Sequence, residues 1–329
     1  MVKKMKKMLT LFLLLIAIVC SGCVLENEEV KTYPLLDNTN EPTIDFLQPW
    51  AFYNKTSEEL DKHFEELKTR GFKTIIIQNI SKYDKGEPKE CFYDSEKSFP
   101  LEKKDFLEKV ITICNEKNIN VICGISSDDY WWSQTSHEFD EETMNMFNEE
   151  ETFTIGEILA KYKIQGIYYS NEMYSNSEGF IKSWTKNINK IIEYIEKIDP
   201  KMPFYLSPFN SSFYGGSEKQ KLSFWKEFFQ EINFRKFDYF LLQDGFGALS
   251  KDPTTKKCED VYNLNVKIRS LCLEYSKVNF ALNIELFASK GLASDDRVNI
   301  QKKYANTLGD VIACFSVSHY YIEGGKNEN

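Results

Sequence analysis

Two glutamates, Glu172 and Glu285, have a sequence setting that favours a chemical role. Glu285 lies between Ile284 and Leu286, and the alternation of a strand directs it, together with Asn283, to the face opposite these apolar neighbours. The same alternation directs Glu172 to one face of its own apolar run. A carboxylate among apolar residues is costly unless it is paired or functional. The alternatives are a Glu285 neutralised by Arg or Lys and a Glu172 solvated in a loop.

Two inward carboxylates at strand ends form the pair that glycoside hydrolysis uses, one as general acid and base, the other as nucleophile. We assign the acid/base role to Glu172, because it begins a loop where a proton can exchange with water. We assign the nucleophile role to Glu285, which must stay ionised and therefore needs hydrogen-bond donors. Gln243, His319 or Tyr320 could supply them. A neighbouring carboxylate would raise the pKa of Glu172.

Asp244, in the step Gln243-Asp244-Gly245, is a third acidic candidate. We expect it to orient a sugar hydroxyl or to tune a carboxylate, and the glycine lets backbone and ligand approach closely. Glycoside hydrolysis needs no metal or cofactor, and the sequence predicts neither: its three histidines lie far apart and no Cys-x-x-Cys pair occurs. Four cysteines in apolar patterns are expected to be small core residues: Cys114, Cys123, Cys272 and Cys314.

Short apolar runs, each ending in polar residues, alternate with longer amphipathic stretches. The predicted strands are Ile44–Trp50, Thr74–Gln78, Val121–Ser126, Ile164–Glu172, Phe204–Phe209, Tyr239–Asp244, Phe280–Phe287 and Val311–Tyr320. The predicted helices are Ser57–Arg70, Glu102–Lys117, Thr154–Tyr162, Ser177–Ile198, Glu218–Asn233, Glu259–Ser276 and Asp295–Leu308. This alternation predicts an α/β fold, a (β/α)8 TIM barrel without a complete eighth helix. An open doubly wound sheet is the alternative, but no GxGxxG or P-loop pattern follows any strand.

The active site of such a barrel lies at the carboxyl ends of the strands and in the loops that follow. Polar and aromatic residues gather at these positions, and flat aromatic rings are stacking surfaces for sugar rings. The alternative for each ring is packing under a loop. The predicted substrate-binding residues are Gln48, Trp50, Gln78, Trp131, Trp132, Asn171, Phe209, Asn210, Gln243, His319 and Tyr320.

The placement of Asn171-Glu172 near the fourth run and Glu285 on the seventh resembles clan A glycoside hydrolases. That resemblance implies an Asn-Glu pair that supplies the acid/base and a strand-seven Glu that is the nucleophile. A second resemblance covers roughly residues 43–321 and is to the bacterial domain-of-unknown-function family 4434. It implies a glycosidase-type barrel, and Glu172, Asp244 and Glu285 match its acidic motif positions. The segments that carry it are Phe46–Trp50, Gly166–Glu172, Leu206–Phe209, Gln243–Gly247 and Asn283–Phe287.

The N-terminal segment has the pattern of a targeting signal that precedes the folded domain. Four lysines and an apolar run over 9–19 are followed by Ser21-Gly22-Cys23, which resembles a bacterial lipobox. We expect residues 1–22 to be a lipoprotein signal peptide and Cys23 to carry a lipid. We expect residues 23–42 to be a flexible tether and residues 43–329 to form one domain. The protein would then be anchored to the cell membrane, outside the cytoplasm. An ordinary secretory signal is the alternative.

Composition excludes several classes of protein. Hydrophobic residues at 42% and charged residues at 28% are typical of a folded globular chain. The net charge of −9 disfavours a nucleic-acid partner. Two functions remain open. One is a glycoside hydrolase, in the first instance a retaining one, that acts on an oligo- or polysaccharide. The other is a non-catalytic carbohydrate-binding or surface-interaction protein on the same barrel. The sugar, the linkage and the oligomeric state stay open.

Overall fold

A computed structural model describes residues 41–133, 140–174, 179–211, 216–289, 291–308 and 311–322. The chain divides into two units, Met1–Thr32 and Tyr33–Asn329, and every described residue belongs to the second. The predicted signal peptide, Cys23 and the tether up to residue 40 lie outside the described residues. Among the described helices, none is long and apolar enough to cross a membrane.

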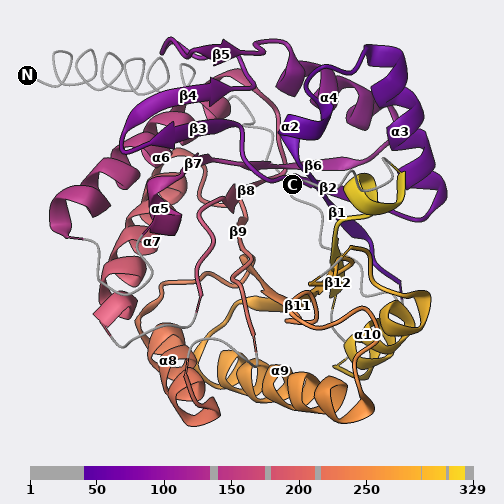
Figure 1. Ribbon diagram of the computed structural model, residues 1–329. Helices are drawn as coiled ribbons and strands as arrows, with labels where there is room; N and C mark the ends of the chain where they lie inside the picture. The colour runs from indigo at the N-terminus through magenta and orange to yellow at the C-terminus, as the bar shows by residue number, and fades with distance from the viewer. Residues whose placement is uncertain are drawn as a thin grey trace, which may run out of the picture. The chain divides into compact units, whose positions relative to one another are not determined.

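Eight parallel strands close into a barrel, in the order β1-β12-β11-β10-β9-β8-β6-β2 (Figure 1). Closure is made where β1 pairs with β12, with Ile44 opposite Ala313. The barrel strands are β1 (Ile44–Leu47), β2 (Thr74–Ile77), β6 (Asn120–Gly124), β8 (Gly166–Tyr169), β9 (Phe204–Leu206), β10 (Tyr239–Gln243), β11 (Asn279–Glu285) and β12 (Val311–Phe315). The predicted (β/α)8 barrel is confirmed. All eight predicted strands were too long at their carboxyl ends, because their last residues lie in the loops and short elements that follow the barrel strands.

Alternation along the strands divides the buried residues into two layers. Phe46, Ile76, Tyr168, Leu241 and Ala281 belong to the group that fills the inside of the barrel. Residues of opposite parity, such as Ile77, Ile167 and Leu282, pack between the strands and the helices. The predicted parity of the fourth and seventh strands is therefore confirmed, because Tyr168 and Ala281 point inward. Ser170 and Glu172 follow Tyr168 on the same face, and Asn283 and Glu285 follow Ala281, so these four residues lie toward the mouth of the barrel.

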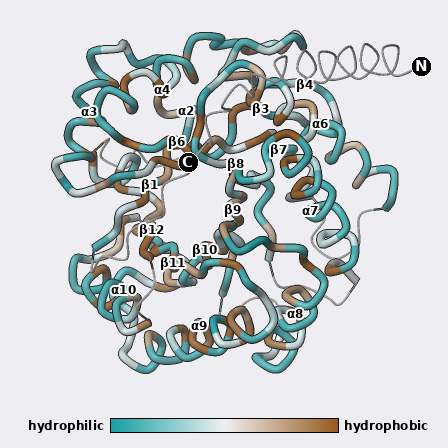
Figure 2. The backbone as a smooth tube through the Cα atoms, turned by 180° about the vertical axis from the view of Figure 1, so that it is seen from behind, coloured by the Kyte–Doolittle hydropathy of each residue, from teal (hydrophilic) through white to brown (hydrophobic). Residues whose placement is uncertain are grey.

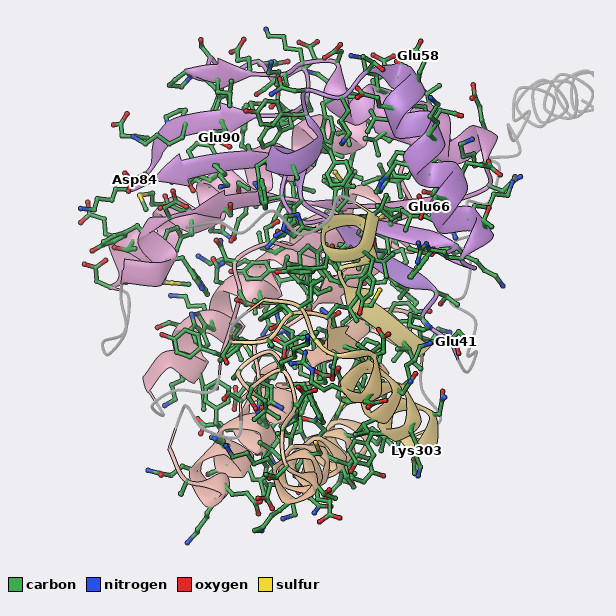
Figure 3. The ribbon with its side chains drawn as sticks, turned by 45° about the vertical axis from the view of Figure 1, so that its right-hand side comes forward. Glu41, Glu58, Glu66, Asp84, Glu90 and Lys303 are labelled. Carbon is green, nitrogen blue, oxygen red and sulfur yellow. The ribbon has the colours of Figure 1, made fainter. Side chains whose placement is uncertain are left out.

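A ring of helices covers the barrel (Figure 1). The helices are α2 (Pro49–Phe52), α3 (Ser57–Thr69), α4 (Phe106–Glu116), α5 (Tyr130–Ser133), α6 (Glu141–Lys161), α7 (Gly179–Ile198), α8 (Glu218–Glu231), α9 (Thr255–Tyr275) and α10 (Asp295–Leu308). The longer ones are amphipathic: α3 buries Leu60, Phe64 and Leu67, and its Glu58 and Glu66 project into solvent (Figure 3). Figure 2 shows hydrophobic residues concentrated in central strands such as β11 and β12, with hydrophilic residues along the outer helices.

Helix α6 begins at Glu141, well before the predicted start at Thr154. The sequence signal was weak there because Glu149, Glu150 and Glu151 interrupt the apolar pattern. The structure buries Glu150 and Glu151, and Asp140 caps the helix by accepting a hydrogen bond from the Thr143 backbone N–H at 2.8 Å. After β12 the described chain forms one π-helical turn, Ser318–Ile322. The expectation of an incomplete eighth helix concerns residues beyond it, which lie outside the described part of the chain.

A small sheet that the sequence analysis did not predict is attached to the barrel, in the order β5-β4-β3-β7. Its strands are β3 (Ser81–Asp84), β4 (Glu87–Cys91), β5 (Leu101–Glu102) and β7 (Ser126–Asp128). β3 and β4 form an antiparallel hairpin between β2 and α4, and β7 follows directly from β6. Gly124 ends β6 where a Cβ would lie 2.3 Å from two carbonyl oxygens, so only glycine fits. Through the pairing of β3 with β7, the hairpin lies beside the carboxyl end of β6, at the mouth of the barrel.

Candidate active site

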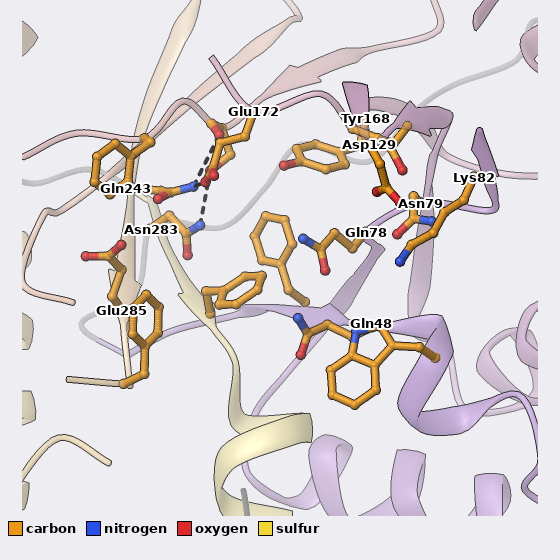
Figure 4. Close-up of a pocket in the computed structure, with 18 of the residues that line it drawn as sticks. Gln48, Gln78, Asn79, Lys82, Asp129, Tyr168, Glu172, Gln243, Asn283 and Glu285 are labelled. Carbon is orange, nitrogen blue, oxygen red and sulfur yellow. Dashed lines mark hydrogen bonds between the residues drawn. The ribbon is translucent and has the colours of Figure 1, made fainter. Parts of the chain in front are cut away.

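A cavity of about 360 Å³ opens at the carboxyl ends of the barrel strands (Figure 4). That volume lies within the range of small-molecule pockets. Its walls combine aromatic rings, amide side chains and several carboxylates. The lining residues are Phe46, Gln48, Trp50, Gln78, Asn79, Lys82, Ser127, Asp128, Asp129, Tyr168, Ser170, Glu172, Ser207, Phe209, Gln243, Asn283, Glu285, Phe287 and Phe315. Glu172 and Glu285 both belong to this set, as the strand parity predicted.

Glu285 is the last residue of β11, the seventh barrel strand, and is only 1% exposed. Its Oε2 accepts a hydrogen bond of 2.6 Å from the backbone N–H of Gly247. Its Oε1 has no hydrogen-bond partner among the described residues. The donor is therefore a backbone group, and the expectation that Gln243 serves Glu285 is wrong. The arrangement fixes one carboxylate oxygen and leaves the other available to a ligand.

Asp244 lies directly behind Glu285, on the loop that follows β10. Its Oδ1 accepts hydrogen bonds from the backbone N–H groups of Phe246 and Glu285, at 3.1 and 3.3 Å. Its Oδ2 accepts one from Nε2 of Gln301 on α10, at 2.7 Å. Buried Arg297 donates to the carbonyl oxygen of Glu285 at 2.7 Å. Asp244 is buried and is not one of the residues that line the cavity. It can tune and position Glu285, but the predicted contact with a sugar hydroxyl is not supported.

Glu172 follows β8, the fourth barrel strand, and is half-buried. Its Oε1 accepts a hydrogen bond from Nε2 of Gln243, which ends β10 (Figure 4). The backbone carbonyl of Glu172 accepts a hydrogen bond of 2.7 Å from the indole N–H of Trp131. Hydrogen bonds from Gln243 and Trp131 therefore fix both the side chain and the backbone of Glu172, although it lies in a loop.

The three acidic groups have raised pKa values, chiefly because burial disfavours their charged forms. The pKa of Glu172 is raised to about 7, against the opposing hydrogen bond from Gln243. The pKa of Asp244 is raised to about 6. That of Glu285 lies well above its ordinary value, through burial and then the negative charge of Asp244. The shift of the Glu172 pKa has the predicted direction, but burial causes it and not the neighbouring carboxylate that the sequence suggested. The sequence predicted that side-chain donors keep Glu285 ionised. Instead, the donor to its carboxylate is a backbone N–H, and the pKa shift favours the protonated form.

Five predicted substrate-binding residues line the cavity together with the two glutamates: Gln48, Trp50, Gln78, Phe209 and Gln243. Five others are not among the lining residues: Trp131, Asn171, Asn210, His319 and Tyr320. The side chain of Trp132 lies outside the described residues. Amides on strand ends and aromatic rings nearby are the groups that bind sugar hydroxyls and sugar faces.

The five residues outside the lining support the loops that carry the site. Trp131 is 2% exposed and stacks on Trp184, with ring centroids 5.6 Å apart. Nδ2 of Asn171 donates to Oε1 of buried Glu151 at 2.9 Å. Nδ2 of Asn210 donates to Asn265 at 2.7 Å. Their side chains were predicted to touch substrate and instead pack or bond within the protein. The rings of His319 and Tyr320 lie behind Trp50 and Phe287, at 5.0 and 5.8 Å between centroids.

Several lining residues were not chosen from the sequence. Asn79, Lys82 and Asp129 come from the loop and hairpin around the small sheet. Asn79 and Asp129 follow shortly after predicted strands, so their positions at the mouth agree with the sequence pattern although they were not selected as binding residues. Lys82 lies on a short polar strand without a periodic signal and could not be predicted. Asn283 and Phe287, by contrast, share the inward face of the seventh strand with Glu285. Strand alternation alone would have placed them in the site.

Neither a metal site nor a disulfide appears among the described residues. No group of three or more His, Cys, Asp or Glu side chains there could hold a metal ion. The six described cysteines are free and buried, and the expected core positions of Cys114, Cys123, Cys272 and Cys314 are confirmed.

Glu172→Gln is expected to stabilise the fold at pH 8. Since the folded-state pKa is raised to about 7, the folded chain keeps a proton that the unfolded chain loses near its ordinary pKa of about 4.3. The stability contributed by that proton is fully present below pH 4 and is lost as the pH rises through 7. Glutamine keeps the acceptor for Gln243 without a charge. By scanning fluorimetry, Tm should exceed wild type by a few degrees at pH 8 and match it at pH 4; a lower Tm at pH 8 would contradict the account.

Gly247→Ala is expected to disable the site while leaving the barrel folded. A Cβ at this position would lie 2.5 Å from the ring of Phe287 and 3.0 Å from Cδ of Glu285. The displacement breaks the hydrogen bond that fixes Oε2 of Glu285, and a misplacement near 1 Å can cost about 10²-fold in rate. Assays of the glycoside hydrolysis expected from the sequence should show that loss beside an unchanged far-ultraviolet circular dichroism spectrum. Activity within twofold of wild type would show that the Gly247 contact is dispensable.

Comparison with known proteins agrees with this architecture. The family described as Domain of unknown function (DUF4434) matches residues 45–327. No curated protein sequence matches the chain.

A putative alpha-L-fucosidase from Bacteroides thetaiotaomicron is similar in structure, with a TM-score of 0.67 and 20% identity over 90% of this chain and 91% of that chain. An intracellular xylanase from Thermoanaerobacterium saccharolyticum gives a TM-score of 0.53 at 14% identity, over 92% and 94% of the two chains. An endo-beta-1,4-mannanase from Thermotoga petrophila gives 0.53 at 14%, over 88% and 68%. The fold is thus that of glycoside hydrolase barrels.

Proposed function

We propose that this chain, which belongs to the DUF4434 family, is a glycoside hydrolase that acts on an oligo- or polysaccharide. One observation carries the proposal: Glu172 and Glu285, from the fourth and seventh barrel strands, line one cavity. Paired carboxylates of this kind perform glycosidic cleavage through an oxocarbenium-like transition state. The raised pKa of Glu172 suits a general acid at neutral pH.

In the proposed reaction, Glu172 protonates the leaving oxygen and Glu285 attacks the anomeric carbon through its unbonded Oε1. Glu285 must be ionised for this step, whereas burial and Asp244 favour its protonated form. Glu285 therefore gives up its proton to solvent before the step, and it is the ionised fraction that attacks. The positive charge that develops on the sugar is then stabilised by this carboxylate. Water then releases the sugar, with Glu172 as the base. The aromatic rings of Trp50, Phe209 and Phe287 are suited to stack on sugar faces.

The test is a panel of aryl glycosides and cell-wall glycans, assayed by released phenol and by new reducing ends. Wild-type protein should cleave at least one member, and Glu285→Gln should not. If no member is cleaved while oligosaccharides still bind, the protein is a carbohydrate-binding protein on the same barrel, and the enzymatic proposal fails.

We further propose that Cys23 is lipidated and anchors the domain at the outer face of the cell membrane. The support is the sequence Ser21-Gly22-Cys23 after an apolar run. Cys23→Ala is expected to release the mature protein from the membrane fraction and to abolish its labelling by a fatty-acid analogue. A variant that remains membrane-bound and labelled would refute the anchor.

A further inference from the structure

Lys82 differs from the other lysines of the segment between β2 and α4. Four of those pair with specific groups: Lys85 lies over the ring of Tyr130, Lys97 over Phe153 and Lys103 over Tyr53, and Lys89 is 3.9 Å from Asp84. The fifth, Lys104, is 3.5 Å from Glu102. No hydrogen bond or ion pair joins the Lys82 ammonium to another described residue. It is also the one Lys or Arg among the described residues that line the cavity.

The position of Lys82 is fixed by its strand. Its neighbours Ser81 and Tyr83 are 0% and 1% exposed and point away from the cavity. Alternation along β3 therefore directs Lys82 to the opposite face, where it pairs in register with Ser127, another lining residue. Figure 4 shows the Lys82 side chain on the side of the cavity away from Glu285, beside Asn79.

The hairpin that carries Lys82 is held rigidly. The carboxylate of Asp128 accepts three backbone hydrogen bonds, from the N–H groups of Lys85, Gly86 and Tyr130, at 3.0, 3.0 and 2.7 Å. Lys85 and Gly86 both have positive φ, which matches the turn type of tight hairpins. Asp128 is therefore occupied with the turn and is not an ion-pair partner of Lys82.

The charge of the cavity makes this ammonium unusual. Four carboxyl groups line the walls: Asp128, Asp129, Glu172 and Glu285. Lys82 is the one basic side chain among these lining residues, so it is the point in the cavity best suited to attract a negative group of a ligand. A charge-assisted hydrogen bond from an ammonium to an anion is about twice as strong as one between neutral groups. A cation kept unpaired at one end of the cavity thus provides a place for one negative group of a ligand.

We propose that the site takes an acidic saccharide, and that Lys82 binds a carboxylate or sulfate on a sugar unit away from the point of cleavage. This inference rests on the proposed function for the identity of the site as a sugar site. Asn79 and Gln78, which line the same side, supply amide groups to the neutral hydroxyls of that unit.

The test measures binding by calorimetry in the Glu285→Gln background, so that ligand is not consumed. The probes are matched pairs: uronate-containing oligosaccharides with their carboxyl-reduced forms, and sulfated oligosaccharides with their desulfated forms. At least one acidic probe should bind about tenfold more tightly than its neutral partner, equivalent to about 1.4 kcal/mol. The carboxylate and sulfate arms show which group is recognised. This preference should shrink as salt concentration rises.

Variants identify the residue responsible. Lys82→Gln should abolish the preference and leave the neutral partners within about twofold, whereas Lys82→Arg should restore most of it. Lys89→Gln is the matched control, because it removes the same charge from the same hairpin outside the cavity lining. Asp129→Asn should strengthen acidic binding, since it removes a nearby carboxylate.

The inference is overturned if acidic and neutral partners bind equally, if no acidic probe binds, or if Lys82→Gln keeps the preference. Hydrolysis of the same probes by wild-type protein is scored separately. Selective binding without hydrolysis would refute the proposed enzyme and leave the Lys82 inference intact. Hydrolysis of neutral probes, with no preference for acidic ones in binding, would support the proposed enzyme and refute the Lys82 inference.

Discussion

Glu285→Gln is expected to lower kcat/KM by on the order of 10⁴–10⁶-fold, the range seen when a covalent nucleophile is removed. The substitution leaves an amide oxygen to accept the hydrogen bond from Gly247 and removes the attacking oxygen. KM should change little, because sugar contacts come from the aromatic and amide walls. Steady-state kinetics on the best substrate of the panel measures both parameters. A loss below tenfold would mean that Glu285 is not the nucleophile.

Glu285→Ala provides a sharper control on the assignment. Removing the side chain opens space for a small anion beside the anomeric carbon. Azide is therefore expected to restore activity and to give a glycosyl azide whose anomeric configuration is opposite to that of the substrate. Gln301→Ala tests the layer behind, since it removes a donor to Asp244 without touching the cavity. It should reduce rate far less than loss of Glu285 itself.

Glu172→Ala is expected to cost roughly 10²–10⁴-fold for substrates with poor leaving groups, the usual contribution of a general acid. Aryl glycosides with good leaving groups need no proton and should lose much less in the first step. Azide should speed breakdown of the trapped intermediate and give the azide of retained configuration. If azide products from the Glu172 and Glu285 variants are exchanged, the two roles are reversed.

The pH profile provides an independent control on Glu172. The acid must be protonated to act, and its pKa is raised to about 7. Wild-type activity on poor leaving groups should therefore fall as pH rises above 7, and this limb should disappear in Glu172→Gln. A profile in which the variant keeps the alkaline limb would assign that titration to another group.

The barrel and its catalytic pair could be predicted because they depend on patterns that repeat. The apolar runs ending in polar residues marked every barrel strand, and period-two alternation placed Glu172 and Glu285 in one cavity. The same reasoning wrongly predicted that the side chains of Trp131 and Asn171 line the cavity. Position after a strand shows that a residue is near the mouth, but only packing shows which way it points. Trp131 packs on Trp184 and Asn171 bonds with Glu151, two partners distant in sequence.

The small sheet and the donor to Glu285 could not be read from the sequence. The strands around Lys82 are short, polar and paired through a hairpin, so their side chains show no apolar period. The donor to Glu285 is the backbone of Gly247, and any residue carries an N–H. What singles out Gly247 is the lack of room for a Cβ between Phe287 and Glu285, which is a property of the folded chain.

Trapping of the covalent intermediate tests the central claim most directly. Glu172→Ala is incubated with an aryl glycoside that wild type cleaves, digested, and mapped by peptide mass spectrometry. The account predicts one added glycosyl unit, located on Glu285, and none in the Glu172→Ala/Glu285→Gln double variant. An adduct on another residue, or no substrate cleaved by wild type at all, would contradict it.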